Sequence, residues 1–422
     1  MEQQNSDLRN DPYIALRFPE FRSFLVMRFF LTIGYQIQGV ILGWYVYSLT
    51  KDPLSLGLIG LAEAVPAIGI ALYGGYIADK SNKKTLLHKV IGLILLSSTV
   101  MFVVTLPNVT LSLSQSLLIT IIYCMIFVNG IARGFYAPTA FSMMAMIIPR
   151  EHYPNSSTWN SSAWQTASIA GPALGGLLYG FSGIHQTFIV VLICITISFV
   201  GTFFLKSRPS TFVKTGSMLK SVSEGLKFVF KTKMLVGALS LDLFSVFFGG
   251  AVALIPVIAT EILHVGATEF GIMRAMPAAG AVITMLLMTR FSPMGKPWRN
   301  LLFAVTGFGI SIICYGLSRN FYLTLFFLFL EGAFDSVSVI IRSTILQLLT
   351  PDDMRGRVSA VNSMFIGSSN EIGQFESGLT AKLMRTVPAV VFGGFMTLVV
   401  SGVTWFKTKK LIPLTLEDIQ KS

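Results

Sequence analysis

Ten charged side chains lie inside long apolar stretches of this 422-residue chain, which is 53% hydrophobic and only 12% charged. A charge in an apolar environment is costly, so it usually pairs with another charge or lines a polar pathway. The chemistry that we expect of these residues is binding of a polar ligand or transfer of a proton, and structural ion pairing is the alternative. The ten are Arg28, Glu63, Arg133, Asp242, Arg274, Glu331, Asp335, Arg342, Glu371 and Glu376.

The spacing of Glu331, Asp335 and Arg342 places them on one side of a helix, because residues four and seven apart share a face. A shift of the chain by 202 positions aligns Asp335 with Arg133. We predict that Arg133, Asp335 and Glu331 form a charge system at a central cavity, where it binds a polar substrate or senses protons. A buried ion pair that joins two helix bundles would explain the same residues.

Two further carboxylates, Glu371 and Glu376, are five residues apart and therefore about 140° apart on a helix. One is expected to face the cavity and the other a neighbouring helix. A carboxyl group in an apolar setting is more readily protonated, which suits a proton carrier. Pairing with nearby arginines is the alternative for each candidate. In order of preference, the candidates are Glu371, Glu331, Glu63 and Asp242.

The elements that must position these residues are membrane spans, since each apolar stretch reaches the roughly 20 residues that a transmembrane helix needs. A soluble domain carries about 25% charged residues, twice the fraction found here. The first stretch is too long for a signal-peptide core, and we expect it to stay in the mature protein. The fold class is therefore an all-α membrane protein. The twelve predicted spans are 22–48, 56–78, 86–106, 113–147, 157–183, 186–205, 234–259, 267–289, 300–318, 320–349, 357–383 and 387–406.

The basic residues predict the orientation of these spans. If both termini are cytoplasmic, 24 of the 32 Lys and Arg fall in the cytoplasmic segments and 4 in the outer turns. Cytoplasmic loops carry such an excess of Lys and Arg. The formal charge of +12 is therefore explained by topology, and no nucleic-acid partner is expected.

The chain divides into two halves of six spans. Residues 1–205 form the predicted N-terminal bundle, 206–233 a cytoplasmic linker with an amphipathic helix, and 234–422 the C-terminal bundle with a short tail. The shift of 202 residues also matches Gly171 with Gly373 and Gly176 with Gly378, which supports duplicated bundles of the kind found in transporters. Spans 3, 6, 9 and 12 contain none of the ten charges and are expected to face lipid.

Two motifs are more specific than single charges. The loop after the second span contains Gly75, Asp79, Lys80, Lys83 and Lys84, where the glycine permits close helix approach and the lysines hold the turn at an anionic membrane surface. The fifth span contains Gly171, Pro172, Gly175 and Gly176. There the proline frees a backbone carbonyl and the glycines allow tight packing, which together make a pliable hinge.

These motifs resemble those of the major facilitator superfamily, the first as its gating loop and the second as the core of a motif associated with its exporters. The segments 17–22 and 351–358 extend the resemblance to the branch that holds the enterobactin (siderophore) exporters and related drug efflux proteins. The resemblance implies two pseudo-symmetric six-helix bundles, alternating access and proton-driven antiport without ATP.

The predicted function is efflux of a small organic molecule, siderophore-like or drug-like, from a bacterial cell across the inner membrane. The candidate stacking surfaces for a planar ligand are Tyr35, Trp44, Tyr136, Trp159 and Trp164, with Tyr136 preferred because it lies near Arg133. Import of a solute stays open as an alternative, and a non-transporting membrane enzyme or receptor is less favoured. No catalytic residue, cofactor or metal is predicted, and the expected partners are the substrate, protons and lipid, with the protein a monomer.

Overall fold

The computed structural model describes residues 12–208, 218–351, 354–415 and 418, and among them it forms helices and turns without a strand. Ten of the described helices are long and apolar enough to cross a membrane. One of them, α7 (Tyr153–Gly201), is interrupted at Gly183 and corresponds to two of the predicted spans. The polar α14 (Arg355–Met384), of 30 residues, corresponds to another. The predicted all-α fold class with twelve spans is confirmed.

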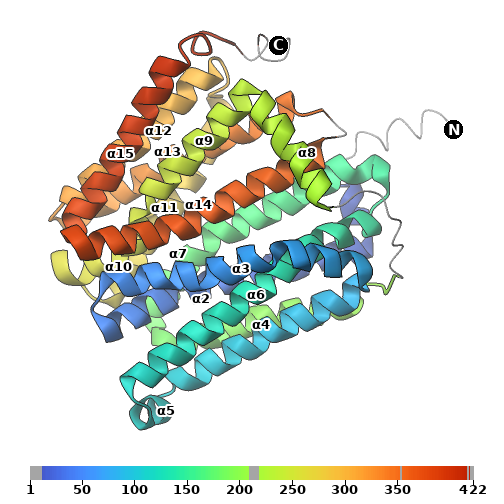
Figure 1. Cartoon of the computed structure of the whole chain (residues 1–422). Helices are drawn as coiled ribbons and strands as arrows, with labels where there is room; N and C mark the ends of the chain where they lie inside the picture. Colours follow the sequence, from blue (N-terminus) through green and yellow to red (C-terminus); the bar gives the residue numbers. More distant parts are fainter. Residues whose placement is uncertain (1–11, 209–217, 352–353, 416–417, 419–422) are drawn as a thin grey trace. The chain divides into compact units, whose positions relative to one another are not determined.

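The remaining helices follow the predicted order along the chain (Figure 1). The first half contains η1 (Ile14–Arg17), α2 (Pro19–Thr50), α3 (Pro53–Lys80), α4 (Lys83–Thr105), α5 (Pro107–Ser112), α6 (Gln115–Ile147), η2 (Arg150–His152) and η3 (Thr202–Phe204). The second contains α8 (Met218–Lys231), α9 (Lys233–Phe248), η4 (Gly250–Leu254), α10 (Ile255–Val257), η5 (Ile258–Ile262), α11 (Ala267–Arg290), α12 (Pro297–Leu317), α13 (Phe321–Leu349) and α15 (Thr386–Lys407).

Three helices begin at a residue whose side chain caps the helix. The side chains of Asn82, Ser114 and Asn320 each accept a hydrogen bond from the backbone N–H three residues later, at 3.1–3.3 Å, and so cap α4, α6 and α13. We use "distal" for the helix ends opposite those at which α2 begins and α3 ends. Three distal turns pass through a non-glycine residue with positive φ, namely Lys51, His264 and Arg385.

Contacts group the chain into two compact units, which we describe separately. Unit 1 takes in residues 1–41, 65–178 and 182–215, and unit 2 takes in 42–64, 179–181 and 216–422. The distal ends of α2, α3 and the first part of α7 thus belong to unit 2. The predicted division at 206–233 into two bundles and a linker stays a prediction.

In unit 1, glycines bring helices into close contact. A methyl group at Gly74 on α3 would collide with the carbonyl oxygen of Gly134 on α6. A methyl group at Gly171 on α7 would lie 2.5 Å from Cβ of Gln36, and one at Gly175 would lie 2.9 Å from Cα of Ile37, so α7 lies directly against α2. The hinge motif of the fifth span therefore lies on the face of α7 that packs on α2.

In unit 2, α11, α12, α13 and α15 pack side by side (Figure 1). The crossing of α11 and α13 leaves no room for side chains, because a methyl group at Gly332 would collide with the backbone of Pro277 and one at Gly280 with that of Phe329. A buried hydrophobic cluster nearer the start of α12 includes Trp298 and Ile345.

The seventh predicted span is not one continuous helix. After Phe248 at the end of α9, the chain passes through Gly249 and Gly250 into the 3-10 turn η4, and after α10 it forms the π-helix η5. Pro256 lacks a backbone N–H, and glycine has little preference for a helix. A methyl group at Gly250 would also lie 2.8 Å from the carbonyl oxygen of Gly373, which presses η4 against α14.

The tight crossing in unit 2 generates a stability prediction. Gly332→Ala should lower the apparent melting temperature of the purified protein, because inserting a methyl group into a packed interface costs about 1–3 kcal/mol. Gly402→Ala on α15 is the matched control, since nothing lies within 4 Å of that position, and it should be neutral or stabilising. Equal melting temperatures for the two variants would contradict this account of the crossing.

Candidate functional site

Unit 1 contains two arginines and two tyrosines that come from facing helices. Arg28 and Tyr35 are seven residues apart on α2, and Arg133 and Tyr136 are three apart on α6, so each pair shares a helix face. The guanidinium carbon of Arg133 lies 5.5 Å from the ring centroid of Tyr35, and the charge of Arg28 acts on the phenol of Tyr136. We call these four residues the arginine–tyrosine cluster.

Two buried polar atoms of this cluster have no hydrogen-bond partner among the described residues, namely Nε of Arg28 and the hydroxyl oxygen of Tyr136. Two pairs of polar side chains on α2, α4 and α6 satisfy each other: the hydroxyl of Ser97 donates to Asn129 at 2.7 Å and that of Ser98 donates to Gln38 at 2.6 Å. A buried polar group without a partner costs free energy. The arginine–tyrosine cluster therefore offers donors that an anionic or polar ligand would satisfy.

Unit 2 contains a second cluster, around Glu331 on α13. Glu331 is buried, and its Oε2 atom has no partner among the described residues. The charges of Arg274 on α11 and of Asp335 on α13, and the phenol of Tyr315 on α12, interact electrostatically with it. Arg274 Nε and the Tyr315 hydroxyl also lack partners in the described part of the chain. We call Glu331, Arg274, Asp335 and Tyr315 the Glu331 cluster.

Arg274 also ties the Glu331 cluster to the broken seventh span. One of its terminal nitrogens donates a hydrogen bond to the carbonyl oxygen of Val252 in η4 at 3.2 Å. Such a carbonyl is available because η4 does not continue the α-helix of α9. The interruption at the glycines therefore supplies an acceptor for a buried arginine.

A third group of charged residues, unlike the two clusters, consists of an arginine and an aspartate that pair with each other. Arg342 on α13 forms an ion pair with Asp242 on α9, and their side chains are only 11% and 6% exposed. Arg342 Nε donates in addition to the carbonyl oxygen of Ser338 at 3.3 Å. For these two residues, the geometry agrees with the structural alternative that the sequence left open.

The other predicted site residues lie in unit 2, in the hinge motif of α7, or where α3 ends and α4 begins; the predicted gating residues are therefore helical, Gly75 to Lys80 in α3 and Lys83 and Lys84 in α4. Glu63, Glu371 and Glu376 are all half-buried in unit 2, on α3 and α14. Arg133 belongs to unit 1, whereas Glu331 and Asp335 belong to unit 2, so their predicted charge system stays a prediction.

In the predicted gating loop, the lysines are held individually. The ammonium of Lys83 donates to the carbonyl oxygen of Ser81 at 3.3 Å, and that of Lys84 donates to the carbonyl oxygen of Phe203 at 2.9 Å. Lys80 lies 4.9 Å from the ring centroid of Tyr76. Gly75 is buried, and the side chain of Asp79 lies outside the part of the chain that the structure describes.

At the distal end of unit 2, segments from both predicted halves meet. The hydroxyl of Tyr47 on α2 donates to a carboxyl oxygen of Glu261 in η5, and Lys382 on α14 pairs with Asp52 at 2.7 Å. The ring of Trp44 lies 4.3 Å from that of Phe270, measured between centroids. We call these six residues the distal lock.

Backbone contacts at the distal end are as close as those inside a helix bundle. The hydroxyl of Thr268 donates to the carbonyl oxygen of Gly180 at 2.9 Å. Methyl groups at Gly57 and Gly60 on α3 would lie 3.0 and 2.8 Å from the backbone oxygens of Phe375 and Glu371 on α14. The distal ends of α2, α3 and α7 are therefore closed tightly against η5, α11 and α14.

Six participants were not found from the sequence: Tyr315 of the Glu331 cluster, and Tyr47, Asp52, Glu261, Phe270 and Lys382 of the distal lock. Tyr315 lies in a span without charges that was expected to face lipid, and Glu261 and Asp52 lie at span ends, where a carboxylate has an ordinary explanation. An aromatic residue with a polar atom inside an otherwise apolar span was the available signal for Tyr315. Among the described residues, no group of His, Cys, Asp or Glu is arranged to hold a metal ion.

Comparison with known proteins identifies the family. A family model described as "Transmembrane secretion effector" matches residues 10–420. The chain belongs to this family. Its members are transporters of the major facilitator superfamily, so the resemblance drawn from the sequence motifs is confirmed, and transport rather than enzymatic catalysis is the family's activity.

The curated relatives of this transporter include enterobactin exporters. EntS of Shigella flexneri is 23% identical over 387 residues, and EntS of Shigella boydii serotype 18 is 24% identical over 387 residues, with 90% of each chain covered in both cases. These relatives and the apolar helices support a multi-pass protein of a bacterial inner membrane.

Solved transporter structures share the fold. A D-xylose-proton symporter matches with a TM-score of 0.70 at 14% identity, covering 94% of this chain and 100% of its own. A bacterial homologue of the human lysosomal transporter Spinster matches with a TM-score of 0.67 at 14% identity, covering 94% and 97%. At this identity the likeness establishes the major facilitator fold alone.

Two ion pairs of unit 2, Asp242–Arg342 and Asp52–Lys382, differ in burial and allow a matched comparison. Asp242→Asn should destabilise the protein strongly, because removing one partner of a buried pair leaves the other charge uncompensated, at about 3–5 kcal/mol. Asp52→Asn removes one partner of a pair whose side chains are 38% and 49% exposed, and it should cost about 0–1 kcal/mol. Thermal unfolding of both purified variants checks this, and a small shift for Asp242→Asn would mean that Arg342 finds another partner.

Proposed function

We propose that this transporter is a proton-driven exporter of a small organic anion that carries aromatic or other planar groups. The observation that carries the proposal is the arginine–tyrosine cluster. Guanidinium groups bind carboxylate and similar oxygens through paired hydrogen bonds, and they also stack on aromatic faces. The unpartnered atoms of Arg28 and Tyr136 are donors that such a ligand would satisfy.

The direction of transport is inferred from two further observations. The relatives whose names give a direction are enterobactin exporters. The glycine and proline motif of the fifth span resembles the exporter motif. It packs on α2 beside Gln36 and Ile37, and α2 is also the helix that carries Arg28 and Tyr35. A siderophore-like anion is therefore the first substrate class to test.

Glu331 is the proposed proton site. It is buried, one of its carboxyl oxygens is unpartnered, and it interacts with Arg274, Tyr315 and Asp335. A carboxylate there would attract the guanidinium of Arg274, and protonation would remove that attraction. Because Arg274 also holds the carbonyl of Val252 in η4, a change of charge at Glu331 would bear on the broken seventh span.

We assign the distal lock to the outer gate of the transport cycle. With both termini cytoplasmic, as the basic residues predict, the distal ends of the helices are periplasmic. Closure there requires the first-half segments to be held by contacts that can separate. The distal lock provides a hydrogen bond between α2 and η5, an ion pair between the α2–α3 turn and α14, and a ring contact between α2 and α11.

Transport in inside-out vesicles tests the direction and the coupling. With an acidic lumen, enterobactin as the probe should accumulate in vesicles that contain the protein, and dissipation of the proton gradient should abolish the accumulation. Arg28→Gln and Arg133→Gln should reduce accumulation by roughly tenfold each, since a hydrogen bond to a charged group contributes about 1.5 kcal/mol or more. The control Arg290→Gln alters an exposed arginine at the end of α11 and should leave transport unchanged. Loss of the probe from the lumen would indicate import instead.

Glu331→Gln separates binding from coupling. The variant should retain exchange of labelled for unlabelled enterobactin while losing the response to the proton gradient, because the amide keeps the shape of the carboxyl group but carries no proton to exchange. Glu151→Gln, whose parent side chain is 74% exposed, is the control. A gradient response that survives in Glu331→Gln would assign the proton to another carboxyl group.

The gate assignment predicts a change in accessibility. In a background with Cys124, Cys194 and Cys314 replaced by serine, a cysteine introduced by Thr268→Cys should react slowly with a membrane-impermeant maleimide added to intact cells. Adding Tyr47→Phe should accelerate the reaction roughly tenfold, since a hydrogen bond to a carboxylate contributes about 1.5 kcal/mol or more. Tyr322→Phe, at an exposed tyrosine near the start of α13, is the control. Equal rates in both variants would show that Tyr47 does not hold this end closed.

A further inference from the structure

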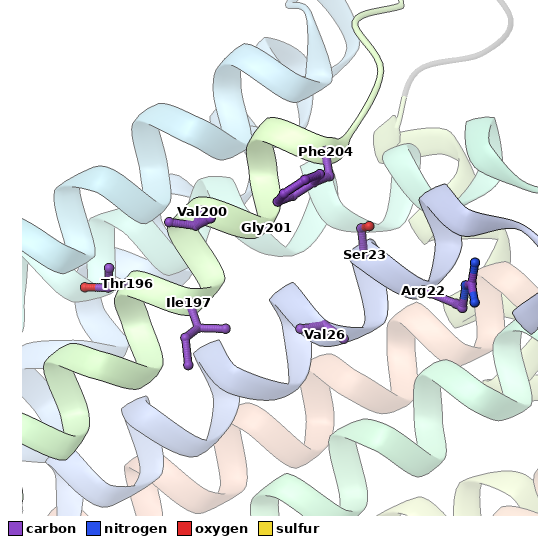
Figure 2. A pocket seen from close by; sticks show the side chains of 8 residues that line it. All are labelled: Arg22, Ser23, Val26, Thr196, Ile197, Val200, Gly201 and Phe204. Carbon is purple, nitrogen blue, oxygen red and sulfur yellow. The ribbon is translucent and has the colours of Figure 1, made fainter.

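A cavity of about 430 Å³ lies in unit 1 between the beginning of α2 and the end of α7. Ser23 and Val26 line it from α2, and Thr196, Ile197 and Val200 line it from α7, with Phe204 of η3 at one end (Figure 2). Its volume is within the range of about 300–1,000 Å³ that is typical of ligand pockets. From Thr196 to Phe204 the chain advances eight residues, or about 12 Å at the helical rise. We call this cavity the α2/α7 groove.

The groove lies on the outer side of unit 1. At about 100° per residue, Val26 is about 160° from Arg28 and about 180° from Tyr35 around α2, so it points away from the face that carries the arginine–tyrosine cluster. Val26, Val200 and Phe204 are 46%, 45% and 67% exposed. An exposed apolar surface on membrane-spanning helices is covered by lipid, so the occupant of the groove has an apolar part.

One end of the groove is cationic. Arg22 lines it beside Ser23, its side chain is exposed, and its guanidinium forms no hydrogen bond or ion pair with any residue that the structure describes. Neighbouring cations are already engaged: Arg208 pairs with Glu20 at 2.8 Å, and Lys84 donates to the carbonyl oxygen of Phe203. Arg22 is therefore available to an anion at the end of an apolar channel.

We propose that the α2/α7 groove binds one anionic phospholipid from the leaflet on the N-terminal side of the protein. The phosphate would lie at Arg22 and Ser23, and one acyl chain would lie along Val26, Ile197 and Val200. The combination of a free guanidinium and an apolar channel about 12 Å long matches a molecule that joins a phosphodiester to a hydrocarbon chain. A soluble phosphate ester would use only the cationic end.

Native mass spectrometry of the detergent-purified full-length protein tests the proposal, with phosphatidylglycerol and phosphatidylcholine of identical acyl chains as probes. The wild-type protein should retain one phosphatidylglycerol in preference to phosphatidylcholine. Arg22→Gln should weaken phosphatidylglycerol binding about fivefold, since a basic residue at the membrane surface contributes about 1 kcal/mol to the binding of an anionic lipid. Arg22→Lys, which keeps the charge, should restore most of the affinity.

Filling the groove tests the apolar part independently. Val26→Phe and Val200→Phe should each weaken the binding of both lipids, whereas Val403→Phe, at a valine that is 47% exposed on α15, should not. Elution on size exclusion and the helical circular dichroism signal identify variants that fold normally, and either groove variant alone suffices. The proposal is overturned if Arg22→Gln behaves like Arg290→Gln, or if a folded groove variant behaves like Val403→Phe. Release of the bound lipid by inorganic phosphate alone would likewise overturn it, because the acyl chain would then contribute nothing.

Discussion

A charged side chain inside a bundle of apolar helices is costly unless it is paired, and this transporter carries ten of them in seven of its helices. The structure deals with these charges in different ways. Arg342 and Asp242 neutralise each other on facing helices. By contrast, Arg28, Arg274 and Glu331 each keep one buried atom without a partner among the described residues. A structural use of charge explains the first arrangement, and the proposed ligand and proton sites rest on the second.

Tyrosine hydroxyls and rings lie beside four of the charges in the helices. Tyr35 lies under Arg133, Tyr136 is close to Arg28, and Tyr315 is close to Arg274 and Glu331. A tyrosine ring accommodates a guanidinium without neutralising it, and the hydroxyl both donates and accepts hydrogen bonds. A tyrosine beside an arginine therefore leaves its formal charge in place, which an aspartate in the same place would neutralise.

Much of the architecture could be predicted from the sequence, because the spans depend on length and hydrophobicity alone. The predicted bounds of 113–147 and 267–289 agree closely with α6 and α11. The interruption after Phe248 was not predicted, since hydrophobicity continues across Gly249, Gly250 and Pro256 and carries no sign of the change in backbone conformation.

The partners of individual charges could not be predicted from the sequence, because Asp242 and Arg342 are brought together by helix packing and not by their separation in the chain. Asn129 and Glu331, which the 202-residue shift aligns, show that equivalent positions of the two halves do not have the same chemistry: Asn129 accepts a hydrogen bond from Ser97, whereas Glu331 has an unpartnered carboxyl oxygen among the described residues.

The helix α2 differs little in hydrophobicity from one face to another. Its apolar residues are spread around its whole circumference, so burial on one side and exposure to lipid on the other are both possible. A few polar residues then define the faces: Arg28 and Tyr35 on the side that contacts α6, and Arg22 beside the groove on the side away from them.

Beyond residue 41, the same helix continues into unit 2, where Trp44 and Tyr47 belong to the distal lock. Displacement of the distal end of α2 would therefore act on the helix that also carries Arg28 and Arg22, the arginines of the proposed ligand and lipid sites. Because an α-helix is stiff along its axis, these three regions can move independently only where the helix bends. No proline lies inside α2 between Pro19 and Thr50, so any such bend would have to occur at its glycines, Gly34, Gly39 and Gly43.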